Sequence, residues 1–203
     1  MGKVIVGMTM SLDGFINDQH GSVAALYADF EALQDSEPMR EAIRDTGAAV
    51  MGANTFRMAE DPDLYADNYE FQVPIFVVTH TAPDKHPRQN DNLTFTFVTD
   101  GLASALAQAK AAAGERDVTV VGGASTIQQI IWAGLFDELH VDVMPVLLGG
   151  GVKLFEGVGG AAIQLERVKV IELPDGRTHL RYRGNGPAVP LAAPKQETQP
   201  HGY

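Results

Sequence analysis

The sequence predicts an α/β protein with a mostly parallel central sheet, flanked by helices, and antiparallel strands near the C-terminus. Short uncharged runs rich in valine and isoleucine alternate with segments of helical periodicity, as in consecutive βαβ units. In the last third, two further runs are joined by Pro174-Asp175-Gly176, which is typical of a hairpin. We expect one domain over residues 1–183, followed by a Pro-rich C-terminal tail over residues 184–203.

Composition excludes several classes of protein. The chain has 203 residues, of which 45% are hydrophobic, so it can form one globular domain with a full-sized core. It has no cysteine, which excludes disulfides and thiolate sites. A net charge of -11 argues against nucleic-acid or anionic-membrane partners, which require a basic face. The N-terminal apolar run is interrupted from Thr9 onward, so we predict a first strand rather than a signal peptide, and a cytoplasmic location.

The first quarter is predicted to be a strand, a turn and a long helical region. Residues 3–10 form the strand, and Asp13-Gly14 supplies the turn. Residues 22–46 are predicted to be helical, since apolar side chains recur at helical spacing and Ser36 precedes a proline as a cap does. Gly47 is placed to end this helix, before a second strand over residues 48–51.

The middle of the chain continues the alternation. A brief helix is predicted from residue 56, a loop over residues 60–72, and strands over residues 75–79 and 94–98. Asp100 is expected to cap the next helix and Gly114 to end it. The apolar face of this helix comprises Leu102, Leu106, Ala109 and Ala113.

The remaining strands follow a glycine-rich turn. A strand over residues 118–121 leads to a helix that closes near Gly134, and a long strand is predicted over residues 139–148. Pro145 inside that strand indicates an edge or a bend. Strands over residues 165–173 and 178–183 form the predicted hairpin.

The turn Gly122-Gly123-Ala124-Ser125-Thr126 has two interpretations. Its backbone N–H groups, at the positive end of a helix, can hold a phosphate, or Ser125 or Thr126 can simply cap that helix. Ligands of parallel sheets bind at the carboxyl ends of the strands. Four polar turns follow predicted carboxyl ends, which favours ligand binding; they begin at Ser11, Gly52, Thr79 and Gly122.

Common catalytic motifs of hydrolases, P-loop enzymes and zinc enzymes are absent from the sequence, and no metal site is predicted. His140 and His179 lie inside predicted strands, where a structural role is expected. His80 follows a strand end and is better placed to contact a ligand. Asp29 lies in the predicted first helix, off its apolar stripe, where a carboxylate is usually exposed.

Five segments together resemble the dihydrofolate reductase-like superfamily, and within it the stand-alone relatives of the reductase domain of riboflavin biosynthesis. The resemblance covers about residues 3–183, with the motifs in the same order. They are Met10-Ser11-Leu12-Asp13-Gly14, Met51-Gly52-Ala53-Asn54-Thr55, Val121-Gly122-Gly123-Ala124-Ser125, Pro145-Val146-Leu147-Leu148-Gly149-Gly150-Gly151 and His179-Leu180-Arg181-Tyr182-Arg183.

The resemblance implies a dihydrofolate reductase-like fold that binds NADPH across the strand ends, often as a homodimer. Met10 would lie near the nicotinamide, residues 52–55 and 122–126 would hold phosphates, and Thr79 with His80 would lie near the adenosine ribose. Asp13 would support its loop or contact substrate. The implied cofactor residues are Met10, Gly52, Ala53, Asn54, Thr55, Thr79, His80, Gly122, Gly123, Ala124, Ser125 and Thr126.

Two departures from the family pattern affect specificity. Ala53 replaces an arginine that helps the folate enzymes bind the 2′-phosphate, so NADH remains an alternative cofactor unless Arg57, Lys85 or Arg88 supplies the charge. Val121 stands where riboflavin reductases commonly carry a substrate-facing glutamate. The resemblance therefore implies an altered substrate at this position rather than the riboflavin step itself.

The function expected from these observations is an oxidoreductase that transfers a hydride to a C=N or C=O bond of a small pterin-like or pyrimidine-like substrate. Asp29 lies in a segment similar to the one that carries the folate enzymes' carboxylate, so the proton for the reduction is expected to come from Asp29 or from water. The alternative is a non-catalytic nucleotide-binding or dimer-scaffold protein that retains the fold.

Overall fold

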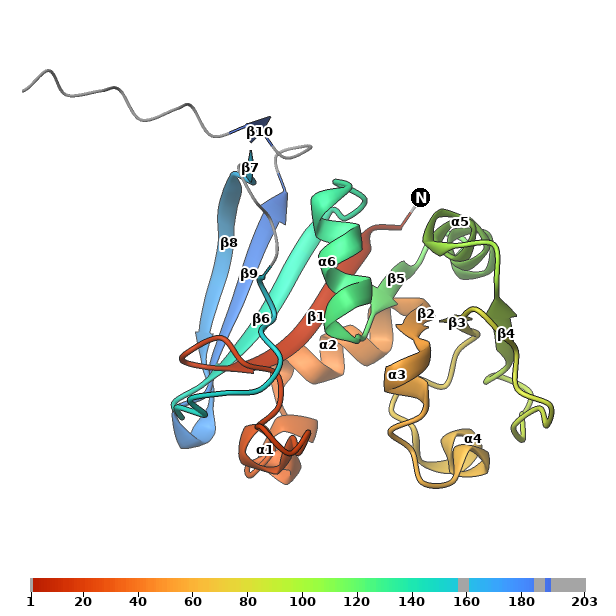
Figure 1. Cartoon of the computed structure of the whole chain (residues 1–203), viewed down its shortest axis with the longest axis horizontal. Coiled ribbons are helices and arrows are strands. Elements are labelled where there is room, and N and C mark those ends of the chain that lie inside the picture. Colours follow the sequence, from red (N-terminus) through yellow and green to blue (C-terminus); the bar gives the residue numbers. More distant parts are fainter. Residues whose placement is uncertain (1, 157–160, 185–188, 191–203) are drawn as a thin grey trace, which may run out of the picture.

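A computed structural model describes residues 2–156, 161–184 and 189–190, and it contains one mixed eight-stranded sheet (Figure 1). The strand order is β4-β3-β2-β5-β1-β6-β9-β8. The strands are β1 (Val4–Ser11), β2 (Thr46–Gly52), β3 (Ile75–Val78), β4 (Phe95–Val98), β5 (Asp117–Val120), β6 (Glu138–Met144), β8 (Leu165–Glu172) and β9 (Thr178–Gly184). Two short strands, β7 (Ala161–Ala162) and β10 (Val189–Pro190), pair separately.

The pairing confirms the predicted fold class. Strands β1 to β6 are joined by parallel ladders, whereas β9 runs antiparallel to both β6 and β8. The turn Pro174–Gly176 joins β8 to β9 as predicted, and Asp175 adopts a φ of 58° there. Because β1, β2, β3 and β5 are parallel neighbours, their carboxyl ends meet along one edge of the sheet.

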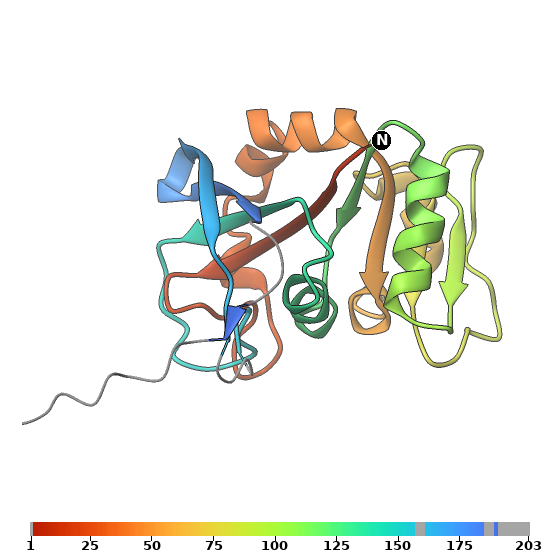
Figure 2. The same cartoon turned by 90° about the horizontal axis from the view of Figure 1, so that it is seen from above.

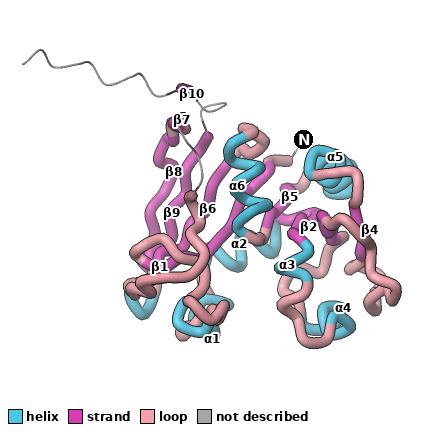
Figure 3. The backbone as a smooth tube through the Cα atoms, viewed as in Figure 1, coloured by secondary structure: helices cyan, strands magenta, loops and turns pink. Residues whose placement is uncertain are grey.

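Helices cover both faces of the sheet. Figure 2 shows α2 on one face and α6 on the opposite face, and Figure 3 shows how the helices lie along the backbone. None of the described helices is long and apolar enough to cross a membrane. The helices are η1 (Ala24–Leu26), α1 (Phe30–Gln34), α2 (Glu37–Asp45), α3 (Ala53–Phe56), η2 (Pro62–Leu64), α4 (Tyr65–Asn68), α5 (Leu102–Ala113), α6 (Ala124–Trp132) and η3 (Pro174–Gly176).

The core is divided by the sheet because side chains alternate along each strand. In β2, Ala48 and Val50 belong to a cluster packed against α5 and α6. Ala49 and Met51 belong to a second cluster on the other face, with Phe71 and other aromatic residues. The second cluster fills only the β2-β3-β4 half of that face, and the other half is lined largely by polar side chains.

The long helix predicted over residues 22–46 is instead three separate helical segments, η1, α1 and α2. Ser36 caps α2 as predicted, and its Oγ accepts a hydrogen bond from the Met39 N–H at 3.3 Å. The prediction that Gly47 ends the helix is wrong, because Gly47 lies in β2. A Cβ at this glycine would lie 2.7 Å from the Arg116 Cβ, so the close approach of β2 to the end of α5 requires glycine.

Other boundaries also differ from prediction. Residues 60–72 contain η2 and α4, which the acidic composition concealed, and Tyr65 and Phe71 pack there with neighbouring aromatic rings. The predicted brief helix begins at Ala53, directly after β2, and ends at Phe56. Pro145 lies just beyond β6 rather than inside it, because β6 ends at Met144.

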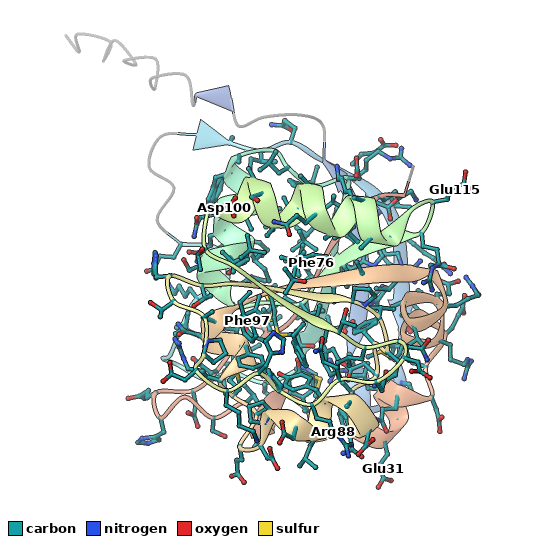
Figure 4. All side chains as sticks on the ribbon, turned by 90° about the vertical axis from the view of Figure 1, so that its right-hand side faces the viewer. Glu31, Phe76, Arg88, Phe97, Asp100 and Glu115 are labelled. Carbon is teal, nitrogen blue, oxygen red and sulfur yellow. The ribbon has the colours of Figure 1, made fainter. Side chains whose placement is uncertain are left out.

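Asp100 does not cap α5. Gly101 occupies the N-cap position with a φ of 105°, no side chain caps the helix, and Asp100 is exposed near its start (Figure 4). Gly114 ends α5 as predicted, with a φ of 65°. Of the predicted tail, residues 185–188 and 191–203 lie outside the described part of the chain. The expectation that the protein forms a homodimer stays a prediction.

Candidate functional site

Two of the predicted cofactor turns lie against each other at the carboxyl ends of β2 and β5. The Gly52 N–H donates a hydrogen bond to the Gly122 carbonyl at 2.8 Å. A Cβ at Gly52 would lie 2.5 Å from the Thr126 Oγ1, and one at Gly123 would lie 3.2 Å from the Thr55 Oγ1. The structure therefore brings the starts of α3 and α6 into one glycine turn, which we define as residues 52–55 and 122–126.

The backbone of this glycine turn has features that only glycine supplies. Gly122 has a φ of 131°, which side-chain-bearing residues rarely adopt, and a Cβ there would lie 3.0 Å from the Thr55 Oγ1. The peptide bond between Gly122 and Gly123 is cis. The interpretation that Ser125 or Thr126 caps α6 is wrong, because Gly123 is the N-cap residue and no side chain caps this helix. Its first backbone N–H groups are therefore available for an anion.

A cavity of about 380 Å³ lies between the sheet and the helices α1 and α2, and residues 69–71 also line it. Met8, Thr55 and Val121 line it, and a Cβ at Gly122 would lie within 3.2 Å of both the Met8 Cε and the Thr55 Oγ1. The cavity thus shares a wall with the glycine turn. A flat ligand group held by the turn could extend directly into the cavity.

Alternate residues of four strands form the sheet-side wall of the cavity, as the twofold period of β-structure dictates. Central strand β1 contributes small and apolar side chains, whereas β6 and β9 contribute ionisable ones. The wall residues are Ile5, Gly7 and Thr9 of β1, Thr119 of β5, Glu138, His140 and Asp142 of β6, and His179 and Arg181 of β9.

Asp29 and Arg177 form a buried ion pair beside the cavity. The Arg177 Nε and Nη2 donate to the two Asp29 carboxylate oxygens at 2.7 and 2.5 Å, and Nη2 also donates to the Leu26 carbonyl at 2.8 Å. Arg177 is 1% exposed and Asp29 is 7% exposed. The hydrogen bond from Arg177 holds the pKa of Asp29 below its ordinary value.

The prediction that Asp29 is exposed within a helix is wrong, since it is buried and flanks the start of α1. Its carboxylate is absent from the described residues that line the cavity. The ion pair keeps Asp29 ionised and occupies both oxygens. This geometry favours a structural role over proton donation.

A second chain of polar contacts runs along the cavity wall. The Arg181 Nε donates to the His179 Nε2 at 2.9 Å, so the ring proton of His179 lies on Nδ1 and is donated to the Asp142 Oδ1 at 2.7 Å. Arg181 also pairs with Glu41 of α2 at 2.6 Å. These contacts join α2 to β9 and β6 and fix the orientation of each side chain.

His140 and Glu138 extend this wall toward the start of β1. The His140 Nε2 lies 3.1 Å from a Glu138 oxygen, and Lys3 pairs with Glu138 at 2.8 Å. Burial lowers the pKa of His140 to about 4, although Glu138 acts against this shift. The imidazole is therefore neutral at neutral pH, and its Nε2 donates to Glu138.

Two of the histidines lie at the cavity and a third does not. His140 and His179, for which a structural role was expected, are held by hydrogen bonds and line the cavity, whereas His80 is exposed beyond β3. The pairing of Gly52 with Val78 places the adjacent Thr79 beside the start of α3, where its Oγ1 donates to the Thr81 carbonyl. Contacts of Thr79 and His80 with a ribose stay predictions.

Of the two methionines near the end of β1, Met8 lines the cavity. Met10, which was predicted to lie near the nicotinamide, is outside the described cavity lining and packs against the core cluster beneath α6. Ala53 and Asn54 open α3, and the Asn54 Oδ1 accepts a hydrogen bond from Arg57 at 2.6 Å.

Asp13 supports the loop after β1. It accepts hydrogen bonds from the Ser11 Oγ at 2.6 Å and from the backbone N–H groups of Leu148 and Gly149 at 3.1 and 2.8 Å. These bonds, led by that of Ser11, lower the pKa of Asp13 to about 2. Both oxygens are engaged, so the structure supports the loop-supporting alternative, and substrate contact by Asp13 stays a prediction.

Three functional candidates were missed in the sequence: Met8, Arg177 and Glu70. Alternation along β1 could have found Met8, but the sequence holds no local signal that pairs Arg177 with Asp29, 148 positions away. Glu70 lies in a segment without periodicity, yet it lines the cavity. Among the described residues, no group of three or more His, Asp or Glu side chains could hold a metal ion.

Comparisons with known proteins agree with this geometry. A family model described as RibD C-terminal domain matches residues 2–178. A crystal structure of a protein provisionally assigned to riboflavin biosynthesis, from Shewanella sp. PV-4, is similar with 26% identity and a TM-score of 0.72, covering 90% of this chain and 98% of that one.

Two more distant structures share the fold. The Thermotoga maritima diaminohydroxyphosphoribosylaminopyrimidine deaminase/5-amino-6-(5-phosphoribosylamino)uracil reductase is 14% identical with a TM-score of 0.59, over 90% of this chain and 56% of that chain. Dihydrofolate reductase from Enterococcus faecalis, complexed with NADP(H), is 15% identical with a TM-score of 0.56, over 91% of this chain and 97% of that chain. The fold is therefore dihydrofolate reductase-like.

Proposed function

Because the chain belongs to the RibD C-terminal domain family, we propose that it is an NAD(P)H-dependent reductase that transfers a hydride to a C=N or C=O bond of a small substrate. The observation that carries this proposal is the wall shared by the glycine turn and the cavity, through Met8, Thr55 and Val121. A dinucleotide held at the turn would present its reactive ring to a substrate in the cavity.

The residues of the glycine turn fit a dinucleotide. Gly122 and Gly123 leave the backbone open to close approach, and the uncapped start of α6 offers N–H groups to a pyrophosphate. In this proposal, residues 52–55 and 122–126 hold the phosphates, and Thr79 with His80 lies near the adenosine ribose. Met8 contacts the nicotinamide, with Met10 behind it.

The bound cofactor would supply the hydride. The chain's part is to hold the substrate against the reactive ring and to exclude water from the cavity. The sequence leaves Asp29 and water as sources of the proton that completes the reduction. The Asp29–Arg177 ion pair supports water or a cavity carboxyl as the donor instead.

Arg57 is the best candidate to recognise a 2′-phosphate in place of the arginine that Ala53 replaces. Lys85 pairs with Asp63, and Arg88 pairs with Asp67. Arg57 is exposed, follows α3, and has no carboxylate partner among the described residues. This contrast supports NADPH over NADH.

Calorimetric titration with NADPH and NADH tests the proposal against the alternative of a scaffold without nucleotide chemistry. We expect micromolar binding of NADPH to the wild-type chain. Gly123→Val should weaken it at least 10-fold, because its side chain would fill the backbone approach beside Thr55.

Ala112→Val is the matched control, since it introduces the same valine side chain at an exposed position of α5 and should leave NADPH affinity unchanged. Thr55→Val supplies a second test of the glycine turn if Gly123→Val does not fold. The absence of binding of either dinucleotide to the wild type at millimolar concentration would contradict the reductase proposal.

A further inference from the structure

We propose that the cavity selects a flat ring that is neutral or cationic and carries N–H donors, that Glu70 anchors it, and that phosphorylated substrates are rejected. This inference rests on the proposed function, because the cavity is taken as the substrate site. It also separates this chain from the T. maritima reductase, whose name specifies a phosphoribosyl substrate.

The balance of charge around the cavity is acidic. Two cations line it, Lys3 and Arg181, and each is already paired: Lys3 with Glu138 at 2.8 Å and Arg181 with Glu41 at 2.6 Å. The lining carboxylates are Glu41, Asp45, Glu70, Asp117, Glu138 and Asp142.

A third cation, Arg177, lies behind the wall and is fully buried. It is bound to Asp29 at 2.5 Å, and its Nη1 lies 3.7 Å from Asp142. No cation that lines the described cavity is therefore left for a phosphate, which at neutral pH carries close to two negative charges. A phosphate would have to displace a carboxylate from its partner, or enter a cavity lined by six carboxylates and only two cations, and both processes are unfavourable.

Glu70 differs from the other carboxylates of the cavity. Asp45 is bonded to Arg44, Asp117 accepts the Lys3 N–H, and Asp142 accepts from His179. Glu70 has no hydrogen-bond or ion-pair partner on another described side chain, and its own backbone N–H is the group that donates to it. A half-buried carboxyl without a side-chain partner has lost part of its hydration, so it gains from a ligand that donates N–H groups.

The electrostatic surroundings of Glu70 agree with this role. Burial raises the pKa of Glu70 above its ordinary value. Burial also raises the pKa of Tyr27, Tyr65 and Tyr69, and the charge of Glu70 adds to the increase in each. Tyr27 and Tyr69 also line the cavity. An N–H-bearing cation would supply the positive charge that this acidic and phenolic corner lacks.

The other walls near Glu70 are apolar and suit a flat ring. Val121, at the glycine turn, packs in the same cluster as Phe71, the neighbour of Glu70. Glu70 and Val121 both line the cavity, and Val121 offers no hydrogen bond to a ligand. The apolar residues of the lining are Phe30, Leu33, Met39, Phe71 and Val121.

Four ring compounds of similar size test the inference: benzamidine, benzamide, benzoate and phenyl phosphate. Each is titrated by NMR into the NADPH-saturated chain, after NADPH binding has been measured alone. We expect benzamidine to bind at least 10-fold more tightly than benzoate, with benzamide between them and phenyl phosphate weakest.

Glu70→Gln should weaken the binding of benzamidine at least 10-fold, whereas Glu70→Asp should retain part of the preference for benzamidine over benzoate. Glu60→Gln is the matched control, because it removes the same charge from an exposed side chain ten positions away and should leave the order of affinities unchanged. If Glu70→Gln does not fold, the order of affinities of the four probes for the wild-type chain tests the inference by itself.

Binding of benzoate or phenyl phosphate as tight as that of benzamidine would overturn the inference, as would equal benzamidine affinity in the wild type and a folded Glu70→Gln variant. Failure of the proposed function has a different signature. In that case NADPH does not bind, while the order of the four probes on the free chain still reports the charge preference of the cavity.

Discussion

The glycine turn and the cavity are neighbouring halves of one site, but they are built differently. The glycine turn uses backbone from two short segments, each placed directly after a strand, and its character depends on the absence of side chains at Gly52, Gly122 and Gly123. The cavity uses ionisable side chains from strands and helices far apart in the chain. A backbone site can keep its ligand while a side-chain site changes its charge, so we expect cofactor and substrate specificity to vary independently.

The largest expected effect is a loss of folding stability that leaves the glycine turn intact. Arg177→Met leaves Asp29 buried without its partner, which should lower the free energy of unfolding by about 3–5 kcal/mol. Chemical denaturation monitored by circular dichroism measures the loss. NADPH affinity of the fraction that stays folded should change little, because Arg177 does not contact the glycine turn.

The double variant Asp29→Leu, Arg177→Met sharpens this test. Replacing both charges by apolar side chains of similar volume should recover most of the lost stability. If the double variant is as unstable as the sum of the two single variants, the ion pair is not the source of the effect.

The second effect comes from His140 and depends on pH. The folded pKa of about 4 lies below the usual 6.5, so the unfolded chain binds a proton that the folded chain does not. Stability should therefore be full above pH 6.5 and fall as the pH drops toward 4, by up to about 3 kcal/mol. Denaturation curves between pH 4.5 and 7.5 measure the slope.

His140→Gln should remove this part of the pH dependence. The slope of stability against pH that remains in this variant then reports the carboxylates, including Glu138. Burial acts to raise the pKa of Glu138, but its hydrogen bonds with Lys3 and His140 lower that pKa overall. An unchanged slope between pH 4.5 and 6.5 in His140→Gln would show that this histidine is not held neutral by the fold.

The smallest expected effect is confined to the cofactor half. Arg57→Gln should weaken NADPH about 10-fold, or about 1.4 kcal/mol, and leave NADH unchanged, because only NADPH carries the 2′-phosphate. Calorimetry with both dinucleotides measures the ratio. Lys110→Gln, an equal change of charge on α5, should alter neither affinity, and equal weakening of NADPH and NADH by Arg57→Gln would assign Arg57 a different role.

Local patterns predicted most of the fold. The strands, the Pro174–Gly176 hairpin and the end of α5 at Gly114 follow from alternation and turn chemistry, which depend on neighbouring residues. The errors occur where a distant contact prevails. Gly47 is a glycine because the end of α5 leaves no room for a side chain on β2, and not because it ends a helix. Tyr65 of α4, in the acidic segment, packs against Phe95 of β4.

The sequence by itself determined the order of the elements and the glycine turn, because a strand, a tight turn and a helix start are encoded within a few consecutive residues. Only the tertiary structure decided the cavity: that Asp29 pairs with Arg177, that His140 and His179 face the same space as Glu41, and that Glu70 stands there alone among the described carboxylates. Charge pairing depends on distance in space, and the sheet order that places β9 beside β6 is not written in any one segment.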